Sequence, residues 1–182
     1  MPEAAKPCIA VIGLGSMGFG MATSLRRAGF EVTGCDVSAD AVKRFVAEGG
    51  KGADTPAQAA KAADIAVSVV VNAAQTETIL FGSGGVAETL AKDAVFVSSA
   101  TMDPDVARRL AKQLEASGRH YLDAPISGGA QRAAQGELTI LASGSAAKPF
   151  SPASQLPGGR LNSAWVRPLR FSRSPIASAG CS

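Results

Sequence analysis

The sequence has no long apolar run, little cysteine and almost no net charge in its first 150 residues. The first apolar run, Cys8–Ile12, has five residues, which is too short for a signal-peptide core or a membrane span. The three cysteines, Cys8, Cys35 and Cys181, match no metal-ligand spacing and no disulfide framework. We therefore expect a cytoplasmic protein with reduced thiols, no metal site and no membrane partner.

Charge and composition divide the chain into two parts. Residues 1–150 hold 14 Lys and Arg against 15 Asp and Glu, so nothing there indicates a nucleic-acid partner. Residues 151–182 lack Asp, Glu and Lys but contain seven Ser, four Pro and four Arg. We predict a folded domain over 1–150 and an unstructured tail over 151–182. The tail has the composition expected from a wrong reading frame of a GC-rich gene.

Strand patterns alternate with helix patterns through the first part. Short apolar runs predict strands, with helices between them (strands over Cys8–Ile12, Glu31–Cys35, Ile65–Val71, Val95–Ser99, His120–Ala124 and Glu137–Ala142). This alternation is typical of βαβ units, in which consecutive strands run parallel. The sequence therefore predicts an α/β fold with a doubly wound, mostly parallel sheet.

A glycine-rich turn lies directly between the first strand and the first helix, with the sequence Gly13-Leu14-Gly15-Ser16-Met17-Gly18. In a dinucleotide site, Gly13 permits the tight turn and Gly15 lets the backbone approach the pyrophosphate. Gly18 then allows the helix to pack close to the strand. The N–H groups and dipole at the start of the helix bind phosphate. We predict that these six residues bind the cofactor.

Asp36, at the end of the second strand, completes the fingerprint. A plain turn at the strand end is the alternative interpretation of this residue. Its carboxylate is expected to accept hydrogen bonds from the ribose hydroxyls and to repel a 2′-phosphate. Residues 37–40 contain no Arg or Lys to accommodate that phosphate. The sequence therefore favours NAD over NADP as the cofactor.

Three stretches together resemble the 3-hydroxyisobutyrate dehydrogenase family of β-hydroxyacid dehydrogenases, which is related to 6-phosphogluconate dehydrogenase. They are residues 11–22 with the glycine turn, residues 123–129 (Asp-Ala-Pro-Ile-Ser-Gly-Gly) and residues 136–140. The resemblance covers about residues 7–150, and residues 71–76 and 127–135 look closest to the L-threonate dehydrogenase branch. It implies a Rossmann-like NAD(P)-binding domain that acts on a small hydroxyacid.

The resemblance also implies further binding residues. Ser127, Gly128 and Gly129 would hold the substrate's carboxylate and hydroxyl. Val71 and Asn72 would border the dinucleotide. Thr101 would lie near the nicotinamide, where the Ser that precedes it in the family pattern is replaced by Ala100. A plain strand-to-helix turn is the alternative interpretation of residues 127–129.

The family's acid/base residue has no counterpart here. By the resemblance, the family has an all-helical second domain, whose first long helix carries a Gly-x-x-x-Lys-x-x-Asn motif. The Lys of this motif acts as the general acid/base on the substrate hydroxyl, and the domain supplies the oligomer interface. The only lysine after Gly129 is Lys148, followed by Pro149. The single histidine, His120, opens a strand at the edge opposite the substrate turn, so we assign no catalytic residue.

The leading hypothesis is NAD-dependent oxidation of a small β-hydroxyacid, of the 3-hydroxyisobutyrate or L-threonate type, by hydride transfer. We expect this chain to be a truncated, inactive form that lacks the all-α domain and keeps NAD binding. A non-catalytic dinucleotide-binding module is the alternative. A phosphogluconate dehydrogenase is a weaker third choice, because Asp36 disfavours NADP.

Overall fold

The computed structural model describes residues 6–144 and 160–161 of the 182. Seven strands form the main sheet in the order β3-β2-β1-β4-β5-β6-β9, and all except the antiparallel β9 run parallel. Their bounds are β1 Cys8–Ile12, β2 Glu31–Cys35, β3 Lys51–Ala53, β4 Ile65–Ser68, β5 Val95–Ser98, β6 His120–Asp123 and β9 Ser143–Gly144. The predicted α/β fold with a doubly wound, mostly parallel sheet is confirmed.

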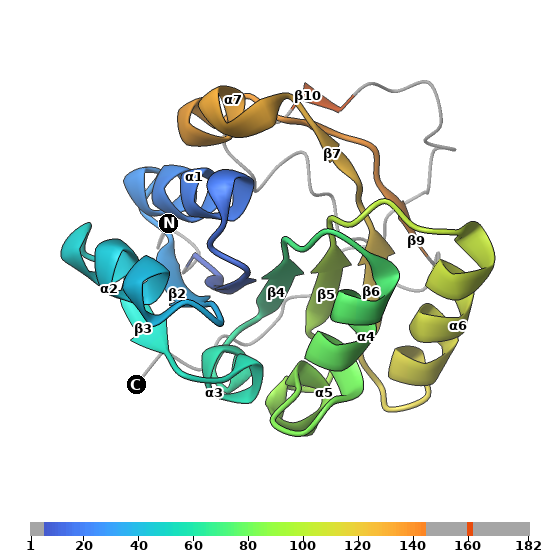
Figure 1. Ribbon diagram of the computed structural model, residues 1–182. Helices are drawn as coiled ribbons and strands as arrows, with labels where there is room; N and C mark the ends of the chain where they lie inside the picture. The colour runs from blue at the N-terminus through green and yellow to red at the C-terminus, as the bar shows by residue number, and fades with distance from the viewer. Residues whose placement is uncertain (1–5, 145–159, 162–182) are drawn as a thin grey trace, which may run out of the picture.

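Helices cover both faces of this sheet (Figure 1). They are α1 Ser16–Arg27, α2 Ala39–Ala47, α3 Pro56–Ala60, α4 Ala73–Phe81, α5 Val86–Thr89, α6 Pro104–Glu115 and α7 Gly129–Gln135. One buried cluster lies under α1 and α2 around Phe45, and a second lies under α3, α4, α5 and α6 around Phe96. Because the strands are buried on both faces, they are apolar almost throughout.

Short polar side chains set the starts of the helices. Ser38 accepts a hydrogen bond from the Ala41 N–H at 3.4 Å, and Thr55 accepts one from the Gln58 N–H at 3.2 Å. Pro follows the cap of α3 and the cap of α6, where its missing N–H costs nothing. Ser38 and Thr55 are therefore the N-cap residues of α2 and α3.

Four predicted strands are shorter than expected, and for two of them, those predicted over Val95–Ser99 and His120–Ala124, the difference is a single residue. The strand predicted over Ile65–Val71 ends at Ser68, where the chain leaves the ladder for the turn into α4. The strand predicted over Glu137–Ala142 is reduced to β8, Thr139–Ile140. It joins a separate small sheet with β7, Ile126–Ser127, and β10, Arg160–Leu161. Apart from β10, the predicted tail over 151–182 lies outside the described residues.

The cysteine at the end of β2 lies in the core. Cys35 is free and buried, and burial raises its pKa to about 11, which makes it an unreactive thiol. Within 6–144 and 160–161, we find no group of His, Cys, Asp and Glu that could hold a metal ion. In the same ranges, no helix is long and apolar enough to cross a bilayer.

Candidate functional site

The glycine-rich turn joins β1 to α1 at the carboxyl edge of the sheet. Gly13 has a φ of +97°, and a Cβ there would lie 2.3 Å from the Val69 carbonyl oxygen. A Cβ on Gly18 would lie 1.8 Å from the Gly13 carbonyl oxygen. Both positions require glycine, because a side chain would push the turn away from the end of β4 or the helix away from the turn.

Gly15 differs from these two glycines, since a Cβ there would meet no atom within 4 Å. It is the N-cap residue of α1, and no side chain caps this helix. Gly15 and Ser16 are exposed, Met17 is half-buried and Leu14 is buried in the core. The backbone at the start of α1 is therefore open to a phosphate, and no side chain competes for its N–H groups.

Asp36 braces the glycine-rich turn. Its Oδ2 accepts a hydrogen bond from the Leu14 N–H at 2.5 Å, and its Oδ1 accepts one from the Ser38 N–H at 2.8 Å. The Gly13 N–H donates to the Cys35 carbonyl at 2.8 Å, which ties the turn to the same strand end. A carboxylate oxygen has two acceptor positions, so each can still accept a further hydrogen bond. This bracing role was not predicted from the sequence.

Val71 and Asn72 follow β4 at the same edge. The Asn72 side chain caps α4 by accepting a hydrogen bond from the Gln75 N–H at 3.0 Å. Gln75 returns the contact, because its Oε1 accepts from the Val71 N–H at 2.9 Å. These reciprocal bonds fix the loop and leave the Val71 side chain 82% exposed. Thr101, after β5, is also exposed, while Ala100 beside it is buried.

The predicted substrate turn, Ser127–Gly129, joins β7 to α7 and is exposed. Gly128 has a φ of +137° and Gly129 a φ of +77°, so both adopt backbone that L side chains rarely adopt. A Cβ on Gly129 would meet no atom within 4 Å, as at Gly15. The turn therefore presents open backbone next to the Ser127 hydroxyl.

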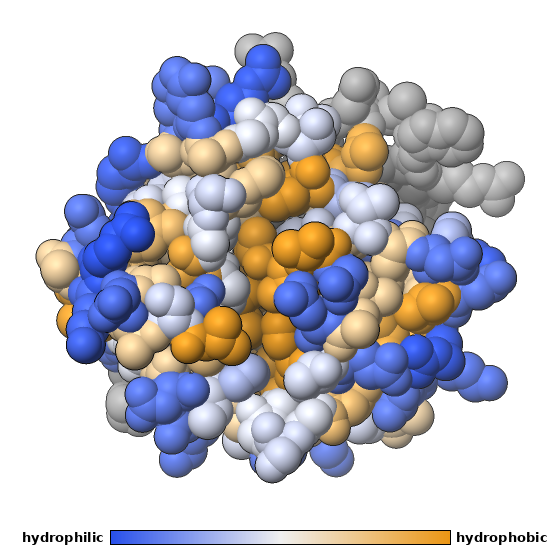
Figure 2. Space-filling view, in the orientation of Figure 1, coloured by the Kyte–Doolittle hydropathy of each residue, from blue (hydrophilic) through white to orange (hydrophobic). Residues whose placement is uncertain are grey.

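All the predicted site residues follow the carboxyl ends of strands. The sheet order reverses between β1, which pairs with β2, and β4, which pairs with β1 on its other side. Ligands of open parallel sheets bind in the crevice at this reversal. Figure 2 shows hydrophobic residues gathered in the middle of the face drawn in Figure 1, between α1 and α2 on one side and α4 and α6 on the other.

Comparison with known proteins identifies the fold family. Residues 8–153 match the family described as the NAD binding domain of 6-phosphogluconate dehydrogenase.

The chain belongs to this family.

Among the relatives of this NAD-binding domain is L-threonate dehydrogenase of Cupriavidus necator. It is 46% identical over 138 residues, which are 76% of this chain and 46% of the relative. Mitochondrial 3-hydroxyisobutyrate dehydrogenase of Mus musculus is 34% identical over 141 residues, 78% of this chain and 42% of the relative. The chain thus spans about half the length of these curated relatives. The resemblance to β-hydroxyacid dehydrogenases is confirmed.

The solved structures agree with this assignment. The 3-hydroxyisobutyrate dehydrogenase of Salmonella typhimurium is 40% identical and superposes with a TM-score of 0.73, covering 77% of this chain and 49% of that one. The family's cofactor is a nicotinamide dinucleotide, and the open backbone at Gly15 fits its pyrophosphate. The candidate site therefore lies at the carboxyl edge of the sheet in an NAD-binding domain of the 6-phosphogluconate dehydrogenase family.

The NAD-binding domain also has a buried polar row at this edge. Ser68, Ser98 and Asp123 end β4, β5 and β6 and stand in register with one another. Within the described part of the chain, Ser68 Oγ, Ser98 Oγ and Asp123 Oδ1 are buried without a hydrogen-bond partner, as is Ser99 Oγ. The Ser98 hydroxyl lies near the Tyr121 phenol but outside hydrogen-bonding geometry. Sequence reasoning missed this row, because single serines in strands carry no functional signal.

Burial changes the acidity of two groups beside this row. It raises the pKa of Asp123, and it raises the pKa of Tyr121, an effect that the Ser98 hydroxyl partly offsets and the Asp123 charge adds to. The Tyr121 hydroxyl lies 3.9 Å from the Met102 sulfur. Asp123 is thus a carboxyl group with a raised pKa on the strand that precedes the proposed substrate turn.

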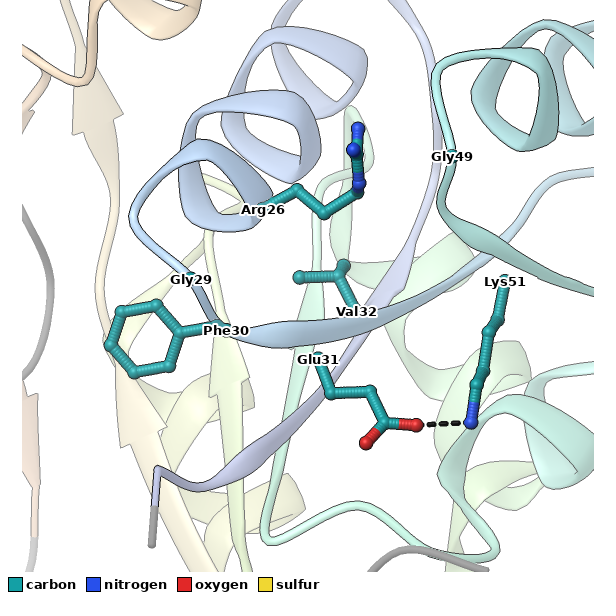
Figure 3. A pocket seen from close by; sticks show the side chains of 7 residues that line it. All are labelled: Arg26, Gly29, Phe30, Glu31, Val32, Gly49 and Lys51. Atoms are coloured by element: carbon teal, nitrogen blue, oxygen red, sulfur yellow. Dashed lines mark hydrogen bonds and ion pairs between the residues drawn. The ribbon is translucent and has the colours of Figure 1, made fainter. Parts of the chain in front are cut away.

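The amino edge of the same sheet differs from the carboxyl edge. A shallow pocket of about 360 Å³ lies there between the end of α1 and the starts of β2 and β3 (Figure 3). Glu31 and Lys51, which form an ion pair, line it with Arg26. His120 starts β6 at this edge, with its Nε2 3.8 Å from an Asp93 oxygen. These residues face away from the cofactor edge, as predicted for His120.

Proposed function

We propose that this domain binds NAD and serves the oxidation of a small β-hydroxyacid, of the L-threonate or 3-hydroxyisobutyrate type, by hydride transfer. The observation that carries the proposal is the turn of residues 13–18, which is open at Gly15 and braced by Asp36. Phosphate binding at the start of α1 needs this open backbone, and ribose binding needs an acceptor at the end of β2.

NAD rather than NADP is the proposed cofactor. The Asp36 carboxylate lies at the position where a 2′-phosphate would approach in this fold, and like charges repel there. Both of its oxygens accept backbone N–H bonds, which hold the negative charge in place. Val37 next to it is fully exposed and, with Val71, offers an apolar side chain to the adenine ring.

The substrate class rests on the turn of residues 127–129 and on the named relatives. Exposed backbone N–H groups and the Ser127 hydroxyl suit a carboxylate and a hydroxyl of a small acid. NAD, when bound, supplies the nicotinamide that accepts the hydride. We propose that Thr101 lies beside that ring and that the chain's own part is to bind and orient the two molecules. The expected cytoplasmic location and the expected lack of activity stay predictions.

Paired titrations with NAD and NADP test the cofactor assignment. We expect NAD to bind at least about tenfold more tightly than NADP, and Asp36→Asn to remove most of this preference, a change of about 1.4 kcal/mol. Asp40→Asn is the matched control, because Asp40 is an exposed carboxylate nearby, in the first turn of α2. Equal binding of both cofactors to the unaltered chain would contradict the proposal. A parallel loss of both in Asp36→Asn would assign this residue to bracing alone.

A dinucleotide-binding module without catalysis is the second candidate. It requires only the open backbone at Gly15 and the Asp36 carboxylate, both of which lie in the described residues. A positioned acid/base group contributes about 10²–10⁴-fold to the rate of such a reaction. NADH formation by the 182-residue chain with L-threonate or 3-hydroxyisobutyrate would favour the enzyme. NAD binding without NADH formation would favour the module.

A further inference from the structure

Helix α7 lies directly against helix α1, and the contact is made where α1 has no side chain (Figure 1). A Cβ on Gly20 would lie 2.7 Å from the Ala134 nitrogen and 2.9 Å from the Ala133 carbonyl carbon. These are backbone atoms, which move only if the whole helix moves. Ala133 is fully buried in this contact. Gly20 therefore sets how closely α7 approaches α1.

A second contact lies two helical turns further along α1. The Arg27 guanidinium donates a hydrogen bond to the Ala134 carbonyl oxygen. Residues seven apart share one face of a helix, so Gly20 and Arg27 hold the same stretch of α7 from the same side. Both contacts are made to the backbone of α7.

Helix α7 continues directly from the proposed substrate turn. Ser127 ends β7, Gly128 is the N-cap residue of α7, and Gly129 is its first residue. The helix has only seven residues, which is about two turns, so residues 133–134 lie close to the turn in the chain. A shift of α7 at residues 133–134 therefore shifts the turn.

We infer that Gly20 and Arg27 are positioning residues for the substrate turn of residues 127–129. The glycine-rich turn of residues 13–18 leads into the start of α1, and α7 packs against the middle and end of the same helix. One rigid helix thus fixes the separation between the dinucleotide and the substrate turn. The inference rests on the proposed function for the role of residues 127–129, but the packing itself is independent of it.

Hydrogen exchange and NAD titration on the 182-residue chain test the inference. We expect Gly20→Ala to speed amide exchange in α7 at least tenfold, and Arg27→Ala about threefold. The dissociation constant for NAD should change less than threefold in both. Arg26→Ala is the matched control, because Arg26 is also in the last turn of α1 but lines the amino-edge pocket. It should change neither quantity.

The outcomes separate positioning from a general effect on the helix. Alanine is a better helix former than glycine, so an effect on α1 alone would leave exchange in α7 unchanged or slower. That result would overturn the inference, as would a loss of NAD affinity in step with faster exchange. Faster exchange in α7 with NAD binding retained would support it.

L-Threonate, added at saturating NAD, links the packing to the substrate. We expect it to shift the amide resonances of Gly128 and Gly129, with a dissociation constant at least fivefold higher in Gly20→Ala. An unchanged dissociation constant would overturn the positioning role. If the unaltered chain shows no such shifts, the proposed substrate class is wrong, and the exchange measurement still decides whether Gly20 and Arg27 hold the turn.

Discussion

The turn that opens α1 and the turn that opens α7 both consist of exposed, glycine-rich backbone, but they are held in different ways. The first follows a five-residue strand at the centre of the main sheet and is braced by Asp36 and by contacts of Gly13 and Gly18. The second follows a two-residue strand in a small separate sheet. Its helix is held mainly by packing on α1. The glycine-rich turn is thus held by the ends of β2 and β4, whereas the turn of residues 127–129 depends on the packing of α7 against α1.

Alanine substitutions in the first turn should give the largest effect and test whether it is built as described. Gly13→Ala should lower the free energy of unfolding by about 2–4 kcal/mol, because it combines left-handed backbone with a contact at the Val69 carbonyl. Gly15→Ala should change it by less than about 1 kcal/mol and reduce NAD affinity by at least about tenfold. Urea unfolding measures the free energy of unfolding, and NAD titration measures the affinity. Equal losses of stability in the two variants would contradict the different roles of Gly13 and Gly15.

Buried polar groups extend the comparison. Beside the glycine-rich turn, the Asp36 oxygens are paired, whereas Ser68, which stands opposite Ile12 on β4, has no hydrogen-bond partner among the described residues. Removing an unpaired buried hydroxyl should help, so Ser68→Ala should raise the free energy of unfolding by about 0.5–1 kcal/mol.

Thr76→Val is the matched control for Ser68→Ala, because its buried hydroxyl donates to the Asn72 carbonyl at 3.1 Å. It should cost about 1 kcal/mol in the same urea unfolding measurement. A loss of stability in Ser68→Ala as large as in Thr76→Val would show that the Ser68 hydroxyl has a hydrogen-bond partner. Ser68 and Asp36 would then not differ in hydrogen bonding.

The smallest expected effect is the pH dependence due to Asp123. Burial raises the pKa of this carboxyl, so the folded state holds its proton more tightly than the unfolded chain does. Its contribution to stability is therefore fully present below the unfolded pKa and is lost as pH rises through the raised folded value. Asp123→Asn should gain stability relative to the unaltered chain over this rise. Unfolding curves at a series of pH values check this, and a constant difference would contradict it.

Sequence reasoning succeeded where a structure is made by neighbours in the chain. The bounds of β1 and β2 and the glycine-rich turn after β1 depend on local preferences. The same reasoning missed β3, because Lys51-Gly52-Ala53 is a strand only through pairing with β2. It also joined β8 to the main sheet, since a sequence pattern does not say which sheet a strand enters. Local patterns therefore predicted the elements better than their partners.

The sequence by itself determined the phosphate turn, the position of Asp36 and the parallel sheet that places both at one edge. These follow from the backbone freedom of glycine, from strand and helix periodicity, and from the direction of βαβ units. Only the tertiary structure decided that Asp36 braces Leu14, that Ser68, Ser98 and Asp123 share a buried row, and that Gly20 receives α7. Each of these joins residues that are far apart in the chain, and their spacing is fixed by packing rather than by any local preference.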